Sequence, residues 1–226
     1  MAGSKHATLE PLARPFRAGD GELPFLYAPL RRATRFLLDS LFALDVGELD
    51  HLPRAGGYIV AANHHNYLDG VVLGAALPRR IAFLVMPRVY RATPLHPLFH
   101  RWAGDIPLNL ERPDPAAMRG ALRLLDAGGV VGIFPEGPFS VRGRLERGLP
   151  GVGLLALRSG APVVPVAIRG TYEALRGRRF YLPRRHPIQV RVGRPRSFAP
   201  TRRGSERGGR EDVTRQVMAD IAALLT

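Results

Sequence analysis

The sequence predicts a single α/β domain, built on a mixed, largely parallel central sheet flanked by helices, with an amphipathic helix at its N-terminal end. Short apolar runs bounded by Gly and Pro alternate with stretches of helical periodicity, which is typical of β-α-β units. A length of 226 residues suits one domain with a sizeable core, and no internal repeat is visible. We therefore expect the chemistry at the ends of strands.

Five apolar runs predict core strands, and a shorter run predicts a sixth strand. The core strands are expected near residues 58–63, 81–86, 130–134, 162–168 and 188–193, and the short strand at 105–110. Periodicity or capping residues predict helices near residues 71–77, 94–102, 115–127, 149–159 and 213–225. In the third of these, Asp114 and Pro115 supply the N-cap and first-turn residues and Gly128 closes the helix.

The chain divides into three segments. Residues 1–23 carry Gly, Ser, Pro and mixed charge without periodicity, so we expect them to be mobile. Residues 24–44 include an amphipathic helix over 30–44, which either rests on an anionic bilayer or packs on the sheet, because the same pattern serves both. Residues 45–226 form the main domain.

The charge balance favours anionic partners. The chain has 33 basic and 19 acidic residues, a net charge of +14, and Lys5 is its only lysine. Arginine binds phosphate and carboxylate bidentately, so phospholipid surfaces, phosphorylated cofactors and nucleic acid are all candidates. Genome composition or heat adaptation would also enrich arginine. No Cys is present, which excludes disulfides and thiol chemistry.

The N-terminal residues lack the features of a targeting or membrane-spanning segment. No window contains the about 18 apolar residues that a membrane span requires. The first twenty residues are polar and have no apolar region typical of a signal peptide. We therefore expect a cytoplasmic protein that is peripheral at the inner face of the membrane.

The stretch from Ala61 to Gly70 contains a candidate catalytic pair. His64 and Asp69 stand five residues apart, between the predicted strand ending near 63 and the helix beginning near 71. His64 would act as a general base through one ring nitrogen, and Asp69 would fix the tautomer through the other. Alternatively, Asp69 only caps the helix. Since no Cys is present and no Ser lies beside the pair, the nucleophile would be the substrate's own hydroxyl.

A second histidine pair has the spacing of metal ligands. His96 and His100 stand at i and i+4 in the predicted helix at 94–102. That spacing can hold a metal, but no third ligand is apparent nearby. We therefore expect a surface or packing role for both and no metal site.

Four sequence blocks, in order and each at a predicted strand end, resemble the glycerolipid acyltransferase family. They are Asn63-His64…Asp69, Gly104…Arg112, Phe134-Pro135-Glu136-Gly137 and Pro165 inside an apolar strand. The resemblance covers roughly residues 45–195 and makes 45–226 the acyltransferase domain. A given tetrapeptide arises by chance in a chain of this length about once in a thousand chains, so the third block is informative.

The resemblance implies acyl transfer from acyl-CoA or acyl-carrier protein to a lipid hydroxyl at an anionic membrane surface. It implies His64 as general base, Asp69 as its orienting partner, and acceptor binding by Arg112 and by Phe134, Pro135, Glu136 and Gly137. It implies no cofactor beyond the acyl-CoA or carrier-protein co-substrate. Glu136 has a second interpretation, as a carboxylate that accepts backbone N–H groups and holds its turn; the two roles can coexist.

Two departures from the family pattern concern the acceptor. The family's second-block arginine usually follows the glycine by six residues, whereas here that position holds Leu110 and the first arginine is Arg112. The third block usually continues with an arginine, which is absent here, so Arg142 or Arg144 would stand in or would be solvated. These departures disfavour glycerol-3-phosphate as acceptor; a lysophospholipid or a less anionic lipid alcohol fits as well.

Two other function classes remain open from the sequence. One is an inactive lipid-binding relative that kept the fold and lost turnover. The other is a basic nucleic-acid-binding protein, suggested only by charge. Aromatic residues make up only 8% of the chain and do not alternate with arginine in a recognition motif, so we expect no nucleic-acid partner.

Overall fold

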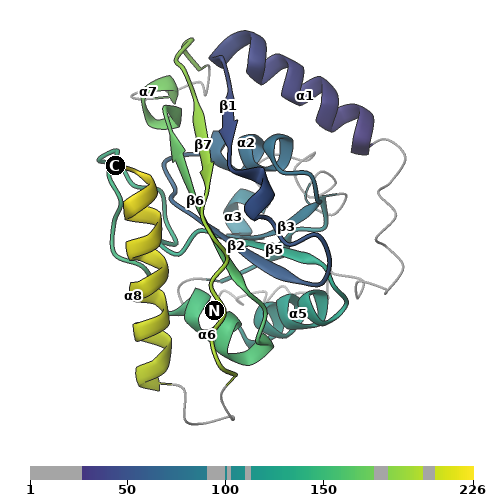
Figure 1. The fold of residues 1–226 in the computed structure, drawn as a ribbon, viewed down its shortest axis with the longest axis vertical. Helices are drawn as coiled ribbons and strands as arrows, with labels where there is room; N and C mark the ends of the chain where they lie inside the picture. Colours follow the sequence, from purple (N-terminus) through teal and green to yellow (C-terminus); the bar gives the residue numbers. More distant parts are fainter. Residues whose placement is uncertain (1–26, 91–99, 101–102, 110–112, 176–182, 201–206) are drawn as a thin grey trace, which may run out of the picture.

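A computed structural model of the chain describes residues 27–90, 100, 103–109, 113–175, 183–200 and 207–226. Its described strands form one sheet in the order β1-β7-β6-β2-β5-β3-β4 (Figure 1). The strands are β1 (Asp45–Gly47), β2 (Tyr58–Ala62), β3 (Ile81–Val85), β4 (Ile106–Pro107), β5 (Val130–Ile133), β6 (Val163–Arg169) and β7 (Gln189–Val192). The N-terminal segment 1–23, which we expect to be mobile, lies outside the described residues, as does most of the predicted helix at 94–102.

The sheet is mixed and largely parallel, as the sequence predicts. The central strands β2, β3, β5 and β6 run parallel, and the edge strand β4 pairs in parallel with β3. Strand β7 pairs antiparallel with β6, and β1 pairs in parallel with β7. The carboxyl ends of the central strands therefore share one edge of the sheet, where open α/β sheets bind ligands.

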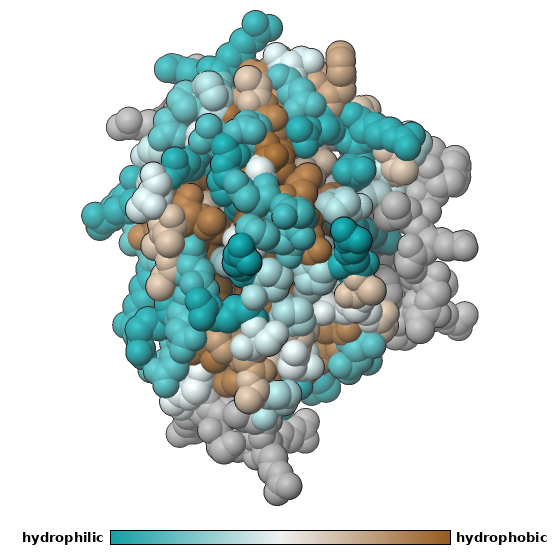
Figure 2. All heavy atoms as spheres, viewed as in Figure 1, coloured by the Kyte–Doolittle hydropathy of each residue, from teal (hydrophilic) through white to brown (hydrophobic). Residues whose placement is uncertain are grey.

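Helices cover both faces of the sheet. The helical elements are α1 (Tyr27–Phe42), η1 (Leu49–His51), α2 (Leu68–Ala76), α3 (Pro87–Tyr90), α5 (Pro115–Asp126), α6 (Gly151–Ser159), α7 (Thr171–Leu175) and α8 (Arg207–Leu224). Helices α1 and α2 contribute to the hydrophobic cluster on one face, while α5, α6 and α8 contribute to the cluster on the other. Charged and polar side chains cover most of the face shown in Figure 2, with apolar residues in patches between them.

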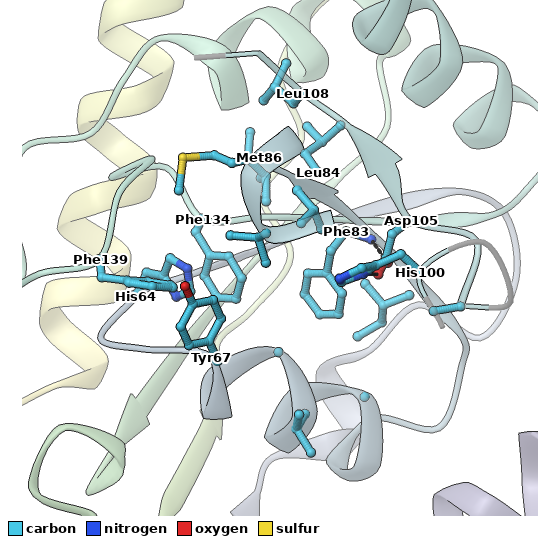
Figure 3. A pocket seen from close by; sticks show the side chains of 18 of the residues that line it. His64, Tyr67, Phe83, Leu84, Met86, His100, Asp105, Leu108, Phe134 and Phe139 are labelled. Atoms are coloured by element: carbon cyan, nitrogen blue, oxygen red, sulfur yellow. Dashed lines mark hydrogen bonds and ion pairs between the residues drawn. The ribbon is translucent and has the colours of Figure 1, made fainter. Parts of the chain in front are cut away.

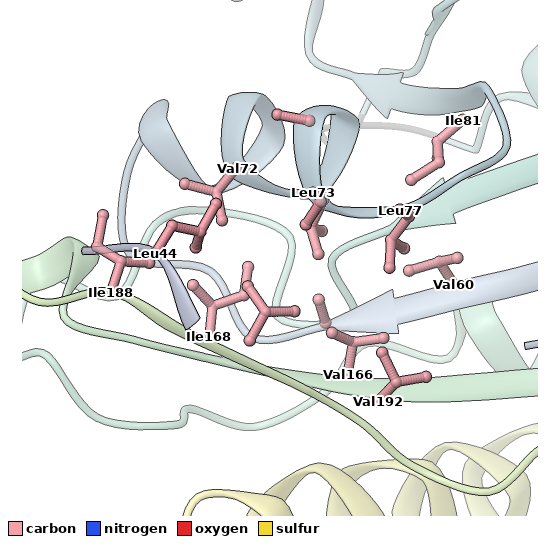
Figure 4. Close-up of a cluster of buried hydrophobic side chains, with 14 of the residues drawn as sticks. Leu44, Val60, Val72, Leu73, Leu77, Ile81, Val166, Ile168, Ile188 and Val192 are labelled. Carbon is pink, nitrogen blue, oxygen red and sulfur yellow. The ribbon is translucent and has the colours of Figure 1, made fainter. Parts of the chain in front are cut away.

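Strand β2 lies between the two clusters and belongs to both. Tyr58, Val60 and Ala62 face the cluster that includes α2, and Ile59 and Ala61 face the other cluster. All five residues are fully buried, as expected for a central strand covered on both faces. Figure 4 shows the first cluster, in which Leu73 and Leu77 point from α2 and its end toward the strands. This packing fixes the end of β2 relative to the start of α2.

Several short helices and strands were not predicted from the sequence. The three-residue strand β1 and the five-residue helix α7 are too short to show a period in the sequence. Helix α3 and the 3-10 turn η1 are equally short. Strand β4 is reduced to two residues of the expected six; it includes Pro107, which has no backbone N–H to donate to a sheet.

Helix α1 packs on α2 with only part of its apolar surface. Tyr27, Leu38 and Phe42 are buried, and the Arg31 guanidinium donates from Nη1 to the carbonyl oxygens of Ala75 (3.2 Å) and Leu77 (3.4 Å) at the end of α2. The outward residues that remain exposed are Leu30, Phe36, Leu37 and Leu41. Among the described helices, none combines the length and apolar character needed to cross a membrane.

Candidate active site

Asn63 connects the end of β2 to β6. Its side-chain amide Nδ2 donates to the Ile168 carbonyl oxygen (2.8 Å), and its Oδ1 accepts from the Ile168 backbone N–H (2.7 Å). Asn63 is fully buried, so its side chain replaces strand pairing at the point where the backbone leaves the sheet. The residue that follows, His64, is thereby placed at the carboxyl edge of the sheet.

Asp69 lies in the first turn of α2 and faces back toward His64. Its Oδ2 accepts three hydrogen bonds, from His64 Nδ1 (2.9 Å) and from the backbone N–H groups of His65 (2.6 Å) and Asn66 (2.8 Å). The carboxylate therefore does not cap α2; instead Asn66 Oδ1 accepts the backbone N–H of Leu68. The hydrogen bond to Asp69 assigns the ring proton to Nδ1, which leaves Nε2 as the basic nitrogen of neutral His64.

Two aromatic rings fix the orientation of the His64 ring. Phe134 stacks on the imidazole with ring centroids 3.7 Å apart and planes 6° from parallel. Phe139 meets it edge-on at 4.5 Å. His64 is only 8% exposed, so its ring has little freedom to rotate. A fixed base needs no reordering before it takes a proton, which is the arrangement that general-base catalysis favours.

The turn at 134–137 holds the histidine's backbone. Glu136 is buried, and its Oε1 accepts from the His64 backbone N–H (2.8 Å) while its Oε2 accepts from that of Glu146 (2.7 Å). Burial raises the pKa of Glu136 to about 6, against the lowering effect of these two hydrogen bonds. Gly137 donates its N–H to the Phe134 carbonyl and has a φ of +80°, which favours glycine.

The imidazole of His64 lines a cavity of about 400 Å³ whose walls are mostly apolar (Figure 3). This volume lies within the range of roughly 300–1,000 Å³ found for small-molecule sites. Of the predicted turn residues, Phe134, Pro135 and Gly137 line the cavity; Glu136 does not and instead holds the turn. Most of the other described lining residues come from α1, from α2 and the residue before it, from β3 and from the segment around β4, and they include Leu30, Tyr67, Gly70, Val71, Phe83, Leu84, Met86 and Leu108. The end of β5, the loop after the 134–137 turn and the start of α6 complete the lining.

Comparison with known protein families gives a match to most of the domain. The family model described as Acyltransferase matches residues 43–169, more than half of the chain. The chain belongs to the acyltransferase family. The matched span contains the His64–Asp69 pair and the turn at 134–137, and it ends with strand β6.

Curated relatives of this acyltransferase include enzymes with named substrates. The 1-acyl-sn-glycerol-3-phosphate acyltransferase of Bacillus subtilis is 26% identical over 156 residues, covering 64% of this chain and 72% of that protein. An uncharacterized protein of Mycobacterium tuberculosis is 32% identical over 167 residues, and the match covers 66% of this chain but only 43% of the mycobacterial protein. The crystal structure of PlsC from Thermotoga maritima, a 1-acyl-sn-glycerophosphate acyltransferase, has the same fold. It superposes with a TM-score of 0.71 at 22% identity, covering 89% of this chain and 80% of that one.

The predicted arginines do not gather around His64 in the described part of the acyltransferase. Arg112 lies outside the described residues. Arg142 and Arg144 are exposed, and neither is among the described lining of the His64 cavity. Arg144 instead lines a separate cavity of about 590 Å³, to which His65 also contributes.

Of the second histidine pair, for which we expect a surface or packing role, the structure describes only His100. His96 lies outside the described residues, but His100 is buried and its Nδ1 lies 2.7 Å from Oδ2 of Asp105. The described part of the acyltransferase contains no cluster of three His, Cys, Asp or Glu side chains that could hold a metal. The sequence does carry a signal for the contact between His100 and Asp105, since these two residues have the same five-residue spacing as His64 and Asp69.

Proposed function

We propose that this protein transfers a fatty acyl group from acyl-CoA or acyl-carrier protein to the hydroxyl of a 1-acylglycerol-3-phosphate or related lysophospholipid. The observation that carries the proposal is the His64 imidazole, bound to Asp69 and facing a cavity with mostly apolar walls. The Bacillus subtilis and Thermotoga maritima relatives are acyltransferases of 1-acylglycerol phosphates, which supports this class of acceptor.

The proposed mechanism uses His64 as the general base. Nε2 takes the proton of the acceptor hydroxyl while its oxygen attacks the thioester carbonyl, and Asp69 stabilises the imidazolium that forms. When the tetrahedral intermediate collapses, the carbon–sulfur bond breaks and the imidazolium returns its proton to the departing thiolate. The products are the ester and the free thiol. The thioester supplies the activation, so the protein must position two substrates and move one proton.

The cavity is the proposed site of an acyl chain. Its walls are formed by Leu84, Met86, Leu108 and other apolar residues, and transfer of an acyl chain from water to such a surface is favourable by about 0.8 kcal/mol per buried methylene. Gly70 and Gly74 on α2 face this cavity, and a Cβ at either position would have no atom within 4 Å. The absence of side chains there widens the cavity along α2.

Arg112 is the proposed contact for the acceptor's phosphate. The exposed positions of Arg142 and Arg144 make them poor candidates, because neither contributes to the described lining of the cavity beside His64. Arginine pairs with phosphate bidentately, so one such residue is sufficient to orient a lysophospholipid.

The exposed side of α1 is the proposed contact with an anionic bilayer. Four large apolar residues are exposed on this helix: Leu30, Phe36, Leu37 and Leu41. Phe36 is 69% exposed, and Leu30 also lines the cavity that contains His64. A helix with apolar residues outward and arginines beside them suits insertion at the boundary of anionic headgroups. Contact with the bilayer on this side would bring the cavity close to lipid substrates.

Release of free thiol tests the function. Purified protein is incubated with a long-chain acyl-CoA and a panel of glycerol-3-phosphate, 1-acylglycerol-3-phosphate and neutral lipid alcohols, and the acylated product is identified by mass. We expect thiol release only with a lipid acceptor present. His64→Ala should lower kcat by roughly 10²- to 10⁴-fold, the usual contribution of a general base.

The control separates loss of the base from loss of any histidine. His186→Ala removes an imidazole that lines the other cavity and should keep wild-type activity. The absence of release with every donor and acceptor, with lipid binding intact, would favour a lipid-binding relative without turnover. Equal activity of His64→Ala and wild type would refute the assignment of the base.

A further inference from the structure

A second buried His–Asp pair faces the same cavity as the first. His100 and Asp105 are 8% and 9% exposed, and His100 Nδ1 lies 2.7 Å from Asp105 Oδ2. Both residues line the cavity that contains His64 (Figure 3). Buried polar groups in a mostly apolar cavity are informative, because an apolar side chain of similar size would avoid the cost of desolvating them.

The second pair lies at the far end of the cavity from the proposed base. The rings of His64, Phe134 and Phe83 form a parallel row, with centroids 3.7 Å and then 5.6 Å apart and both pairs of planes 6° from parallel. Asp105 Oδ1 accepts the backbone N–H of Phe83 (2.8 Å), so the carboxylate is fixed to the last member of this row. In Figure 3, His100 and Asp105 lie on the opposite side of Phe83 from His64.

The carboxylate of Asp105 keeps acceptor capacity in this position. Two carboxylate oxygens offer about four lone-pair sites, and among the described residues Asp105 uses one for the Phe83 N–H and one for His100. Burial raises the pKa of Asp105, while the hydrogen bonds from His100 and Phe83 and the charges of His100 and Arg80 lower it. This end of the cavity therefore presents a preorganised hydrogen-bond acceptor. The terminal methyl group of a plain acyl chain cannot donate to this acceptor.

We propose that Asp105, supported by His100, binds a hydroxyl group carried on the distal part of the acyl chain. The hydroxyl donates to the carboxylate, while the chain between it and the thioester lies along Phe134 and Phe83. This inference rests on the proposed role of the cavity as the acyl site. A site built to hydrogen-bond a hydroxyl discriminates against the analogue that lacks it, whereas one methylene changes binding only weakly.

Fatty-acid binding tests the inference without requiring turnover. Plain and terminally hydroxylated fatty acids of matched, increasing length are titrated against the full chain, and affinity is taken from the shift in thermal unfolding. At the length where the oxygen reaches Asp105, we expect the hydroxylated acid to bind more than tenfold more tightly, as for a hydrogen bond to a charged group. Equal or weaker binding of the hydroxylated acid at every length would overturn the inference.

Two variants assign the preference to the pair. Asp105→Asn keeps an oxygen for the Phe83 N–H but loses the charge, so we expect the preference to fall to severalfold or less. His100→Phe keeps a ring of similar shape and removes the imidazole that favours the ionised carboxyl, with the same expected fall. Asp126→Asn, a matched change at an exposed position on α5, should leave the preference unchanged. A preference that survives both pair variants would refute the assignment.

The outcomes separate this inference from the proposed function. Binding of plain chains as tightly as hydroxylated ones, together with normal thiol release, would refute only the role of Asp105. If neither kind of fatty acid binds, the inference about Asp105 is also overturned, because the acyl site on which it rests is then absent. Thiol release with hydroxylated acyl-CoA at a higher kcat/KM than with the matched plain acyl-CoA would support both.

Discussion

Replacing Asp69 by Asn tests whether one carboxylate oxygen organises the turn at residues 64–69. Oδ2 accepts all three hydrogen bonds, from the His64 ring and from two backbone N–H groups. Oδ1 is buried and accepts no hydrogen bond from the described residues. In Asp69→Asn, the amide oxygen should therefore occupy the Oδ2 position, since the opposite orientation would point an NH₂ group at three donors. The turn and the tautomer of His64 should persist.

The expected loss in Asp69→Asn is then mainly electrostatic. A hydrogen bond to a charged group contributes about 1.5–3 kcal/mol and a neutral one about 0.5–1.5 kcal/mol, so the imidazolium loses about 1–2 kcal/mol of stabilisation. This corresponds to a roughly 5- to 30-fold decrease in kcat. Asp69→Ala removes the acceptor from all three donors and frees the ring, so its loss should approach that of His64→Ala, roughly 10²- to 10⁴-fold.

The assay is initial-rate thiol release from acyl-CoA at saturating acceptor, with circular dichroism and thermal unfolding of each variant as the folding control. Asp69→Asn should also unfold at a lower temperature, because the three hydrogen bonds to Oδ2 are then made to a neutral oxygen and no longer to a charged one. A loss in Asp69→Asn as large as that in Asp69→Ala would refute the argument that a single oxygen holds the turn.

Three further predictions concern other parts of the molecule. Asn63→Leu leaves the backbone N–H and C=O of Ile168 unpaired in the core and should lower the free energy of unfolding by about 2–4 kcal/mol, measured in urea. The pKa of Glu136 is raised from 4.5 to about 6, so its contribution to the free energy of unfolding falls as pH rises across that interval. Urea unfolding at a series of pH values between 4.5 and 6 should show this decline in the wild type, and Glu136→Gln should remove it. The variant Phe36→Ser/Leu37→Ser should bind anionic vesicles severalfold more weakly in a sedimentation assay, with unchanged thiol release from water-soluble substrates; unchanged sedimentation would contradict the bilayer contact.

The sequence was sufficient to predict the central strands and the placement of His64 beside Asp69. Those predictions depend on local information: apolar runs of strand length, and a five-residue spacing that a strand-to-helix turn brings within hydrogen-bond reach. The resemblance to the glycerolipid acyltransferases is confirmed by the family match, and the mixed, largely parallel sheet agrees with the expected fold class.

The contacts that hold the site in place were not predictable in the same way. Asn63 and Ile168 are 105 residues apart in sequence, and Glu136 reaches back 72 residues to the His64 backbone. Such pairings depend on strand order, which a single sequence does not specify. The buried side of α1 was equally ambiguous: its apolar residues form a wide stripe, and packing on α2 buries Leu38 and Phe42 while leaving Phe36 and Leu37 outside.

The residues that hold the backbone of the proposed base differ from those that form the far walls of the cavity, which would determine the preference for an acyl chain. The His64 backbone N–H donates to Glu136, and its carbonyl accepts from the Ser140 N–H (2.8 Å), so the third sequence block and the loop that follows it fix the residue on two sides. The far walls of the cavity come from α1, from β3 and from the part of α2 beyond Asp69, and these walls contribute none of the contacts to the His64 backbone. Substitutions on those walls should therefore change chain preference without moving the imidazole. In this fold, acyl specificity can vary while the proton-transfer geometry is kept.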